Sequence, residues 1–333
     1  MQEFIIFTII LALFFDFING FHDSANAIST VVATKVLTPI RAVGMAAVGN
    51  LIGPLFFSTA IAATIGKGIL KIELAPNNDI LVLMIFSALV GAIIWDLITW
   101  YFGLPTSSSH ALVGGLVGAG LAAIGSTSVN PAGVEKVVAF MVISPIIGMV
   151  AAFILTVFVI RAFYRVSPSK INKYFKRLQL LSAFFYSVTH GTNDAQKTMG
   201  IITVLLVADG SLKTFQVPLL VILAAHISIS LGTFLGGWRI VKTMAQRITK
   251  LRPYQGFCAE TSGGVVLAGM AALGIPVSTT HVISSSIMGV GATDKLSAVR
   301  WGIARKIVGA WILTIPATAL ISAFTFLIIE TIF

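Results

Sequence analysis

Two short hydroxyl-rich segments, each following a proline, occur in equivalent places of this chain. Residues 103–110 read GLPTSSSH and residues 274–281 read GIPVSTTH, an offset of 171 positions. A tetrahedral oxyanion needs several converging hydrogen-bond donors, and a Ser/Thr triplet that opens a helix offers hydroxyls, free backbone N–H groups and the positive end of the helix dipole. The hydroxyls that we expect to face one another across an anion are those of Ser107, Ser108, Ser109, Ser278, Thr279 and Thr280.

The same pattern also suits plain helix capping, because Pro followed by Ser or Thr is a common start of a helix. Either segment alone is therefore as consistent with a cap as with a ligand contact. Their repetition in mirrored positions favours the ligand contact, since matched halves of a transporter build their site where the two repeats meet. We expect Gln196 and Asn193 to add side-chain donors to the same anion.

A second repeated motif carries acids. Residues 20–23 read GFHD and residues 191–194 read GTND, again 171 positions apart. An aspartate in apolar surroundings costs about 2.5 to 3.5 kcal/mol on insertion scales, so a functional role is the first hypothesis for Asp23 and Asp194. Sodium prefers oxygen ligands.

The oxygen ligands predicted for a hard cation such as sodium are the side chains of Asp23, Asn26, Asn193 and Asp194. They would be joined by carbonyls freed where the helices unwind at Gly20 or Gly191. The alternative is that Asp194 is structural and pairs with Lys197. Lys197 could instead contact the anion directly, and the sequence does not separate these roles.

Further polar residues are weaker candidates. His110 and His281 follow the two triplets and could relay protons, since histidine titrates near neutrality; a structural histidine that holds the tip of a hairpin is an equally good interpretation. The remaining candidates for a cation site, a gate or an interhelical hydrogen bond are His22, Asp96, Glu260, Asn50 and His226.

The composition places the chain in a membrane. Hydrophobic residues make up 57% and charged residues 10% of 333 residues, with a mean hydropathy of +0.98, whereas charged residues are about 25% of a soluble domain. Five apolar stretches in each half are mostly long enough for a spanning helix, which needs about 20 residues. They are residues 4–33, 40–66, 80–102, 105–124, 132–160, 181–207, 214–238, 257–273, 276–293 and 303–329. The first stretch lacks the basic start of a signal peptide, so we expect it in the mature protein.

Basic residues predict the orientation. Residues 161–177 contain six Lys or Arg, residues 239–252 contain five, and neither stretch has an acid. Such segments lie in the cytoplasm. The loops of mixed charge near residues 67–79, 125–136 and 207–213 are then outside, together with both termini. The net charge of +10 is mostly this topology signal, and a basic juxtamembrane run attracts anionic lipid without any nucleic acid.

An odd number of crossings in each half inverts the second half relative to the first. The predicted fold is an all-α polytopic membrane protein with two inverted-topology repeats of about five hydrophobic segments each, including re-entrant helical hairpins. Its parts are a first repeat at 1–160, a basic cytoplasmic linker at 161–180 and a second repeat at 181–333.

The motifs resemble those of a known family. GFHDSANA at 20–27, GTNDAQKTMG at 191–200 and WDLITW at 95–100 before GLPTSSSH are similar to the paired signature of the inorganic phosphate transporter (PiT) family. Phe21 and His22 depart from the Gly-Ala-Asn-Asp of that signature, and Asp96 stands where Asn is common. The resemblance implies phosphate uptake coupled to sodium, or in some members to protons, in the plasma or inner membrane. It implies no cofactor besides the coupling ion.

Three classes of function can be compared. A secondary phosphate symporter accounts for the duplication, the inversion, the hydroxyl motifs and the intramembrane acids. An ion channel more often surrounds its pore with symmetric subunits, and a membrane enzyme would need a nucleophile with an acid-base partner or a metal site. The sequence has no GxxxxGK[ST] motif of a primary pump. Sulfate or another tetrahedral oxyanion is the alternative substrate, and a homo-oligomer is left open.

Overall fold

The protein is a long bundle of helices. The computed structural model describes residues 2–55 and 59–332. Prolines begin α2, α6, α7 and α10, where the missing N–H costs nothing. The helices are α1 (Gln2–Ala33), α2 (Pro39–Ile52), α3 (Ala60–Gly68), α4 (Asn78–Phe102), α5 (Ser108–Ala123), α6 (Pro131–Ala162), α7 (Pro168–Ala208), α8 (Leu219–Leu235), α9 (Trp238–Gln246), α10 (Pro253–Ala272), α11 (Thr279–Ala292) and α12 (Trp301–Glu330), with short 3₁₀ turns between some of them.

Among the described residues, four single helices are long and apolar enough to cross a membrane. These are α1, α4, α6 and α12, and two bent helix pairs raise the number to six. The apolar stretch expected at 214–238 contains α8, and the chain turns by 69° at the end of that stretch, between α8 and α9. The expected segment 40–66, in contrast, is divided into α2 and α3, which differ in direction by 86°; its residues 56–58 lie outside the described part.

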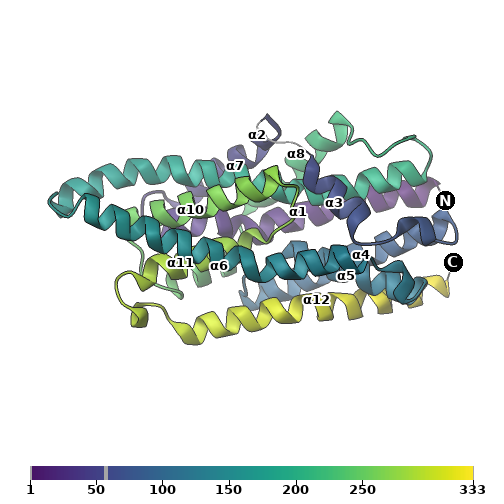
Figure 1. Ribbon diagram of the computed structural model, residues 1–333. Coiled ribbons are helices and arrows are strands. Elements are labelled where there is room, and N and C mark those ends of the chain that lie inside the picture. The colour runs from purple at the N-terminus through teal and green to yellow at the C-terminus, as the bar shows by residue number, and fades with distance from the viewer. Residues whose placement is uncertain (1, 56–58, 333) are drawn as a thin grey trace.

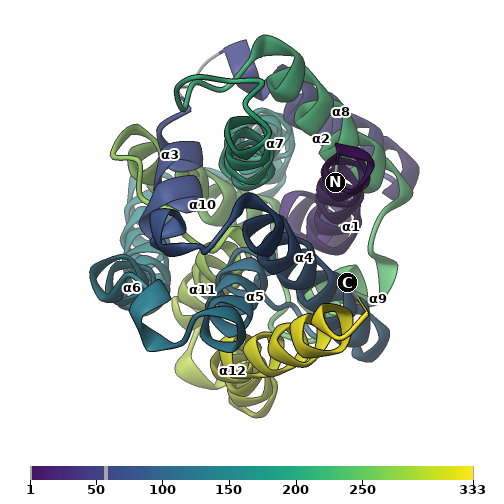
Figure 2. The ribbon, with the colours of Figure 1, turned by 90° about the vertical axis from the view of Figure 1, so that its right-hand side faces the viewer.

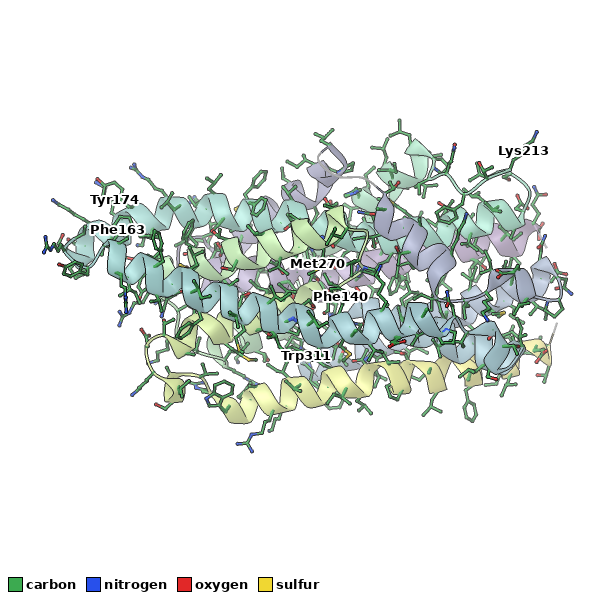
Figure 3. The ribbon with its side chains drawn as sticks, viewed as in Figure 1. Phe140, Phe163, Tyr174, Lys213, Met270 and Trp311 are labelled. Carbon is green, nitrogen blue, oxygen red and sulfur yellow. The ribbon has the colours of Figure 1, made fainter. Side chains whose placement is uncertain are left out.

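The two halves correspond along their length. With the offset of 171, α1 matches α7, α4 matches α10, α5 matches α11 and α6 matches α12. Both chain termini lie at the same end of the bundle (Figure 1). Phe163 and Tyr174 lie at one end and Lys213 at the other (Figure 3), so the basic stretch 161–177 and the mixed loop 207–213 lie at opposite ends of the bundle.

Most of the expected basic linker is helical. Turns and bends occupy residues 163–166, and α7 begins at Pro168 and runs for 41 residues. The stretch 161–180 therefore comprises the end of α6, this short connection and the first turns of α7. The domain boundaries proposed from the sequence fall inside long helices rather than in a loop.

Two helical hairpins carry the hydroxyl motifs. In the first hairpin α4 leads to α5, and in the second α10 leads to α11; α5 and α11 have only 16 and 14 residues. Gly103 and Gly274, at equivalent places before the turns, have φ of 65° and 64°, a left-handed conformation that glycine adopts without strain. We call residues 105–109 the first tip and residues 276–280 the second tip.

The helices of the two acidic motifs are continuous. The expectation that they unwind at Gly20 and Gly191 is wrong, since α1 and α7 run through both positions. The glycines serve close packing instead. A Cβ on Gly20 would lie 2.1 Å from the carbonyl oxygen of Ile229, and one on Gly191 would lie 2.5 Å from Cα of Asn50. Carbonyl ligands from an unwound turn are therefore not available here.

Each hairpin packs on the other repeat. The first hairpin contacts α12 through α5, and the second contacts α6 through α11; α1 packs on α8, and α7 packs on α2 and α3. Seen from the end that carries the termini, α5 and α11 lie in the interior, with α6 and α12 on the periphery (Figure 2). The apolar core forms two separate clusters, one toward each end of the molecule, and the polar motifs lie between them.

Candidate functional site

The two tips open helices in the way that the sequence predicts. Ser107 is the N-cap of α5 and accepts a hydrogen bond from the backbone N of His110 at 3.3 Å; Ser278 is the N-cap of α11 and accepts from the backbone N of His281 at 3.1 Å. These two hydroxyls thus serve the capping role. The next two residues of each tip, which are the first helical positions, point their hydroxyls toward the acidic motifs.

Asp23 joins the two tips. Its Oδ2 accepts a hydrogen bond from Ser108 of the first tip at 3.2 Å, and its Oδ1 accepts from Thr280 of the second tip at 3.3 Å. The Asp23 side chain is 3% exposed, and both hydroxyl residues are buried. One carboxylate on α1 therefore contacts both repeats at a single place in the interior.

Asp194 holds the equivalent place on α7. Its Oδ2 accepts a hydrogen bond from Thr279 at 3.3 Å, and its Oδ1 lies 3.0 Å from Nζ of Lys197. His190, one turn earlier, places Nε2 at 3.3 Å from Oδ2. Asp23, His190 and Asp194 each have one possible ligand atom, a carboxylate oxygen or an imidazole nitrogen, and these three atoms lie within 4.8 Å of one another. The two acids thus approach closely enough to share a cation.

Donors cross between the repeats. Lys197 on α7 donates to Ser109 at 2.9 Å and to Ser108 at 3.5 Å, both in the first tip. Asn26 on α1 donates to Thr280 at 2.9 Å and to Thr279 at 3.3 Å, both in the second tip. The predicted alternative for Lys197, an ion pair with Asp194, is present together with these contacts to the hydroxyls.

His22 extends the cluster toward α4. Its Nδ1 lies 2.7 Å from Oδ1 of Asp23, and its Nε2 lies 3.1 Å from Oγ1 of Thr99 and 3.4 Å from that of Thr106. Thr106 also donates to Thr99 at 2.9 Å. The histidine that departs from the family signature therefore orients the carboxylate beside it.

Three candidates lie apart from this cluster. Gln196 accepts hydrogen bonds from the backbone N of Ile61 and Ala62 and donates to the Thr192 carbonyl at 3.0 Å, so it caps the start of α3. Asn193 donates to backbone carbonyls, and Glu260 accepts from Gln179 and Ser182 in the first half of α7. The structure does not bring Gln196 or Glu260 to the tips.

The two tip histidines contact each other. The ring centroids of His110 and His281 are 4.8 Å apart, and His281 stacks on Trp311 of α12 at 3.8 Å. Trp311 also donates to the Pro105 carbonyl at 2.8 Å. This arrangement favours the structural interpretation, in which the histidines hold the tips against α12.

Asp96 is a buried acid beside the cluster. It is 0% exposed, and neither carboxylate oxygen has a hydrogen-bond partner among the described residues. The other sequence candidates nearby are satisfied by interhelical contacts: Asn50 donates to Thr233 at 2.8 Å and contacts His190, and His226 contacts the Asn50 carbonyl.

The sequence reasoning missed His190 and Asn19. Ser108 forms a short hydrogen bond with Asn19, and His190 lies against Asp194. The two residues are 171 positions apart, and each directly precedes the glycine of its motif. The repeat therefore marks both residues, because each lies one position before the repeated motif at 20–23 or 191–194.

Comparisons with known proteins agree along the whole chain. The sequence profile described as the Phosphate transporter family matches residues 19–322. The probable low-affinity inorganic phosphate transporter of Rhizobium meliloti (strain 1021) is 52% identical over 316 residues, covering 95% of this chain and 93% of that protein. The protein of the same description from Bacillus subtilis (strain 168) is 44% identical over 329 residues, covering 98% of each. A solved structure, the sodium-dependent phosphate transporter, matches with a TM-score of 0.89 at 26% identity, over 99% of this chain and 100% of that one.

Proposed function

Because this chain belongs to the phosphate transporter family, we propose that it takes up inorganic phosphate together with sodium through one site that both repeats share. It is a multi-pass integral membrane transporter and not an enzyme. Phosphate transport follows from the family. The coupling ion, the residues of the site and the alternating exposure of that site to the two faces are the proposed parts.

The hydrogen bonds of Asp23 carry the proposal. Its carboxylate accepts one hydroxyl from each tip, so the donors of both repeats already converge on one buried negative group. The first backbone N–H groups of α5 and α11 have no acceptor inside their helices, and two helix starts from opposed repeats add favourable dipoles. The same tips could therefore surround a phosphate.

The geometry suggests how the cation and phosphate depend on each other. Ser108, Thr279 and Thr280 have hydroxyls directed at the two aspartates. A sodium ion that occupies the carboxylate lone pairs would release these hydroxyls to a phosphate. Without the cation, the phosphate would compete with carboxylates for the same donors, so we expect sodium to bind first.

Charge balance supports the same order. Asp23 and Asp194 are buried, and the ammonium of Lys197 is paired with Asp194. A doubly charged phosphate placed there would leave an excess of negative charge in a medium of low dielectric constant, which is strongly unfavourable. Positive ions that enter with phosphate remove this cost. The likeness to a solved sodium-dependent phosphate transporter favours sodium as that ion.

An uptake experiment tests the proposal. The purified protein is reconstituted into liposomes, and entry of labelled phosphate is measured under an inward gradient of sodium, of protons or of neither. We expect a sodium gradient to drive accumulation and excess unlabelled phosphate to abolish it. Accumulation driven by protons at constant sodium would favour the proton-coupled alternative, and equal inhibition by sulfate would favour a general oxyanion carrier. Entry at channel rates without a gradient would reject alternating access.

A further inference from the structure

A cavity with a volume of about 690 Å³ lies where the chain passes from the first repeat to the second. Its walls come from the end of α6, the connection to α7, the first turn of α7 and the residues that begin α10. The tips and the acidic motifs contribute nothing to its lining. Sites for small ligands have volumes of about 300 to 1,000 Å³, so this cavity is large enough for a ligand of its own.

Aromatic side chains pack the wall between α7 and α10. Phe163, directly after α6, and Tyr254, in the first turn of α10, line the cavity. Both rings contact Phe175 of α7, at centroid distances of 5.6 Å and 6.3 Å. Phe175 is buried and also contacts Phe257 at 5.4 Å. Edge-on contacts between aromatic rings stabilise packing, so the shape of this wall is set by the fold.

Two arginines lie beside tyrosines of the lining. The guanidinium of Arg165 lies 5.2 Å from the ring centroid of Tyr164, and its Nε donates to the Tyr164 hydroxyl at 2.5 Å. Arg252 lines the cavity and lies beside Tyr254. Both arginines are exposed, and within the described part of the chain neither forms an ion pair with an acid. Two positive charges at an apolar cavity are therefore available to an anion.

The surroundings of the cavity carry an excess of positive charge. The stretches 161–177 and 239–252, which meet here, contain six and five Lys or Arg and no acid. Asp294 is an acid near Tyr254, and its Oδ2 accepts a hydrogen bond from Gln255 at 3.2 Å. One carboxylate does not offset so many basic residues, so the cavity favours a negatively charged ligand.

The cavity lies where an apolar span ends. α6 has the length and composition of a membrane span up to Ala162, and its outer face is still apolar at the exposed Phe158. The exposed Tyr164 and Tyr174 follow, interleaved with basic residues, and Figure 3 shows Tyr174 beside Phe163 at this end of the bundle. Tyrosines together with Lys and Arg are typical of the boundary between membrane and water. A ligand in this place can contact lipid chains and water at once.

We propose that this cavity binds an anionic phospholipid, with an acyl chain against the aromatic lining and the phosphate group at Arg165 and Arg252. Guanidinium groups bind phosphate oxygens through paired hydrogen bonds, and basic pockets between membrane helices bind lipid headgroups. A soluble anion would leave the apolar lining in contact with water. A zwitterionic lipid would add a positive group to a positive site, and a second copy of this chain would bring its own basic stretch to it.

The consequence concerns the connection between the repeats. The proposed ligand would contact α6, the start of α7 and the start of α10 together, and would hold the connection against the second repeat. This inference does not depend on the coupling ion or on the residues of the central site.

Lipids with matched chains separate the headgroup from the chain. Thermal unfolding of the full-length protein, purified in detergent and stripped of lipid, is followed at constant ionic strength. The probes are phosphatidylglycerol, phosphatidylcholine with the same acyl chains, and glycerophosphoglycerol, which is the deacylated headgroup. We expect phosphatidylglycerol to raise the unfolding temperature most, phosphatidylcholine to act only weakly, and the headgroup alone to have no effect. Equal effects of the two lipids would reject recognition of the charge, and an equal effect of the headgroup alone would reject the place for the chain.

A double variant locates the site. Arg165→Gln with Arg252→Gln is compared with Lys242→Gln and Lys306→Gln, which remove the same charge from exposed positions on α9 and α12. Each basic residue near a membrane surface favours anionic lipid about fivefold, so we expect the arginine pair to raise the half-stabilising phosphatidylglycerol concentration about 30-fold. Phosphate binding at saturating sodium should match the wild type in both double variants, since none of these residues lies in the central site.

Native mass spectrometry supplies the count of bound lipid. We expect one phosphatidylglycerol to remain on the wild type and on the lysine control at activation energies that remove it from the arginine variant. Equal retention and equal thermal response in the two double variants would show that the lipid binds elsewhere. A lipid-free dimer of the wild type in the presence of phosphatidylglycerol would show that a second copy covers the cavity, and would also reject the lipid site.

Discussion

Asn26 and Lys197 occupy equivalent positions in the two repeats, and each donates hydrogen bonds to the tip of the opposite repeat. Asn26 reaches Thr279 and Thr280, and Lys197 reaches Ser108 and Ser109. The exchange is symmetric in position and asymmetric in charge. Only Lys197 brings a positive charge, and it is paired with Asp194 at 3.0 Å.

Replacing Lys197 tests this pairing. Lys197→Gln leaves Asp194 buried without its ammonium partner. We expect this change to lower the free energy of unfolding by about 3 to 5 kcal/mol. We expect lower yield and a lower unfolding temperature, and we expect Asp194→Asn in the same chain to restore both without restoring sodium-driven uptake. Lys213→Gln, at an exposed lysine, is the control. A single variant as stable as the control would contradict the pairing.

Loss of a tip hydroxyl should weaken phosphate binding. A buried donor to a charged group contributes about 1.5 to 3 kcal/mol, so Ser108→Ala and Thr279→Ala should each raise the phosphate Kd about 10- to 100-fold. Ser285→Ala, at a buried serine further along α11, should leave it unchanged. Equilibrium binding of labelled phosphate at saturating sodium measures the effect. Wild-type affinity in both tip variants would remove the tips from the phosphate site.

Neutralising the central acids should uncouple the cation. Asp23→Asn and Asp194→Asn keep the shape of the side chain and remove the charge that sodium requires, so we expect membrane insertion to persist and sodium-dependent uptake to fall strongly. Asp209→Asn, an exposed acid at the end of α7, serves as the control. Quantified membrane yield and uptake at several sodium concentrations separate the two effects. Unchanged sodium dependence in both variants would show that the carboxylates are structural.

The packing role of Gly20 can be separated from a role in an unwound helix. Gly20→Ala places Cβ 2.1 Å from the Ile229 carbonyl oxygen, whereas Gly44→Ala meets no atom within 4 Å. We expect the first variant to be destabilised and to lose the contact of α1 with α8. The second should gain about 0.5 to 1 kcal/mol from helix propensity. Equal unfolding temperatures for the two variants would contradict the close packing.

Cysteine labelling tests the predicted orientation of the chain in the membrane. In a chain with Cys258→Ser, a cysteine at Ser169 should be protected from an impermeant thiol reagent added outside intact cells, and a cysteine at Ser211 should react. Both serines are exposed and lie at opposite ends of α7 or just beyond it. The opposite pattern of labelling would invert the predicted topology.

The main helices and the correspondence of the two repeats could be predicted because they depend on local sequence patterns. Apolar length predicted the spanning helices, proline and Ser/Thr predicted the starts of α5 and α11, and the offset of 171 predicted which elements correspond. The bend that divides the apolar stretch 40–66 into α2 and α3 was not predicted, since an apolar stretch has the same composition whether it is straight or turned.

The candidate site could be predicted only in part, because a motif shows which residue types are present and not which neighbours they contact. Motif residues on α1 and α7 do meet the two tips. Gln196 looked like a phosphate donor by type, but only the helix phase and the position of α3 reveal that it caps Ile61 and Ala62.

The packing of α5 on α12 and of α11 on α6 bears on the ancestry of the chain. A polypeptide with one repeat would have had no partner helix for the outer face of its hairpin. It could have covered that face only by associating with a second copy of itself inserted upside down. A gene encoding such a subunit would have had to insert in both orientations, and its duplication and fusion would have fixed one orientation for each copy. The asymmetric charges, such as Lys197 opposite Asn26, could arise only after that fusion, when the two copies were free to diverge.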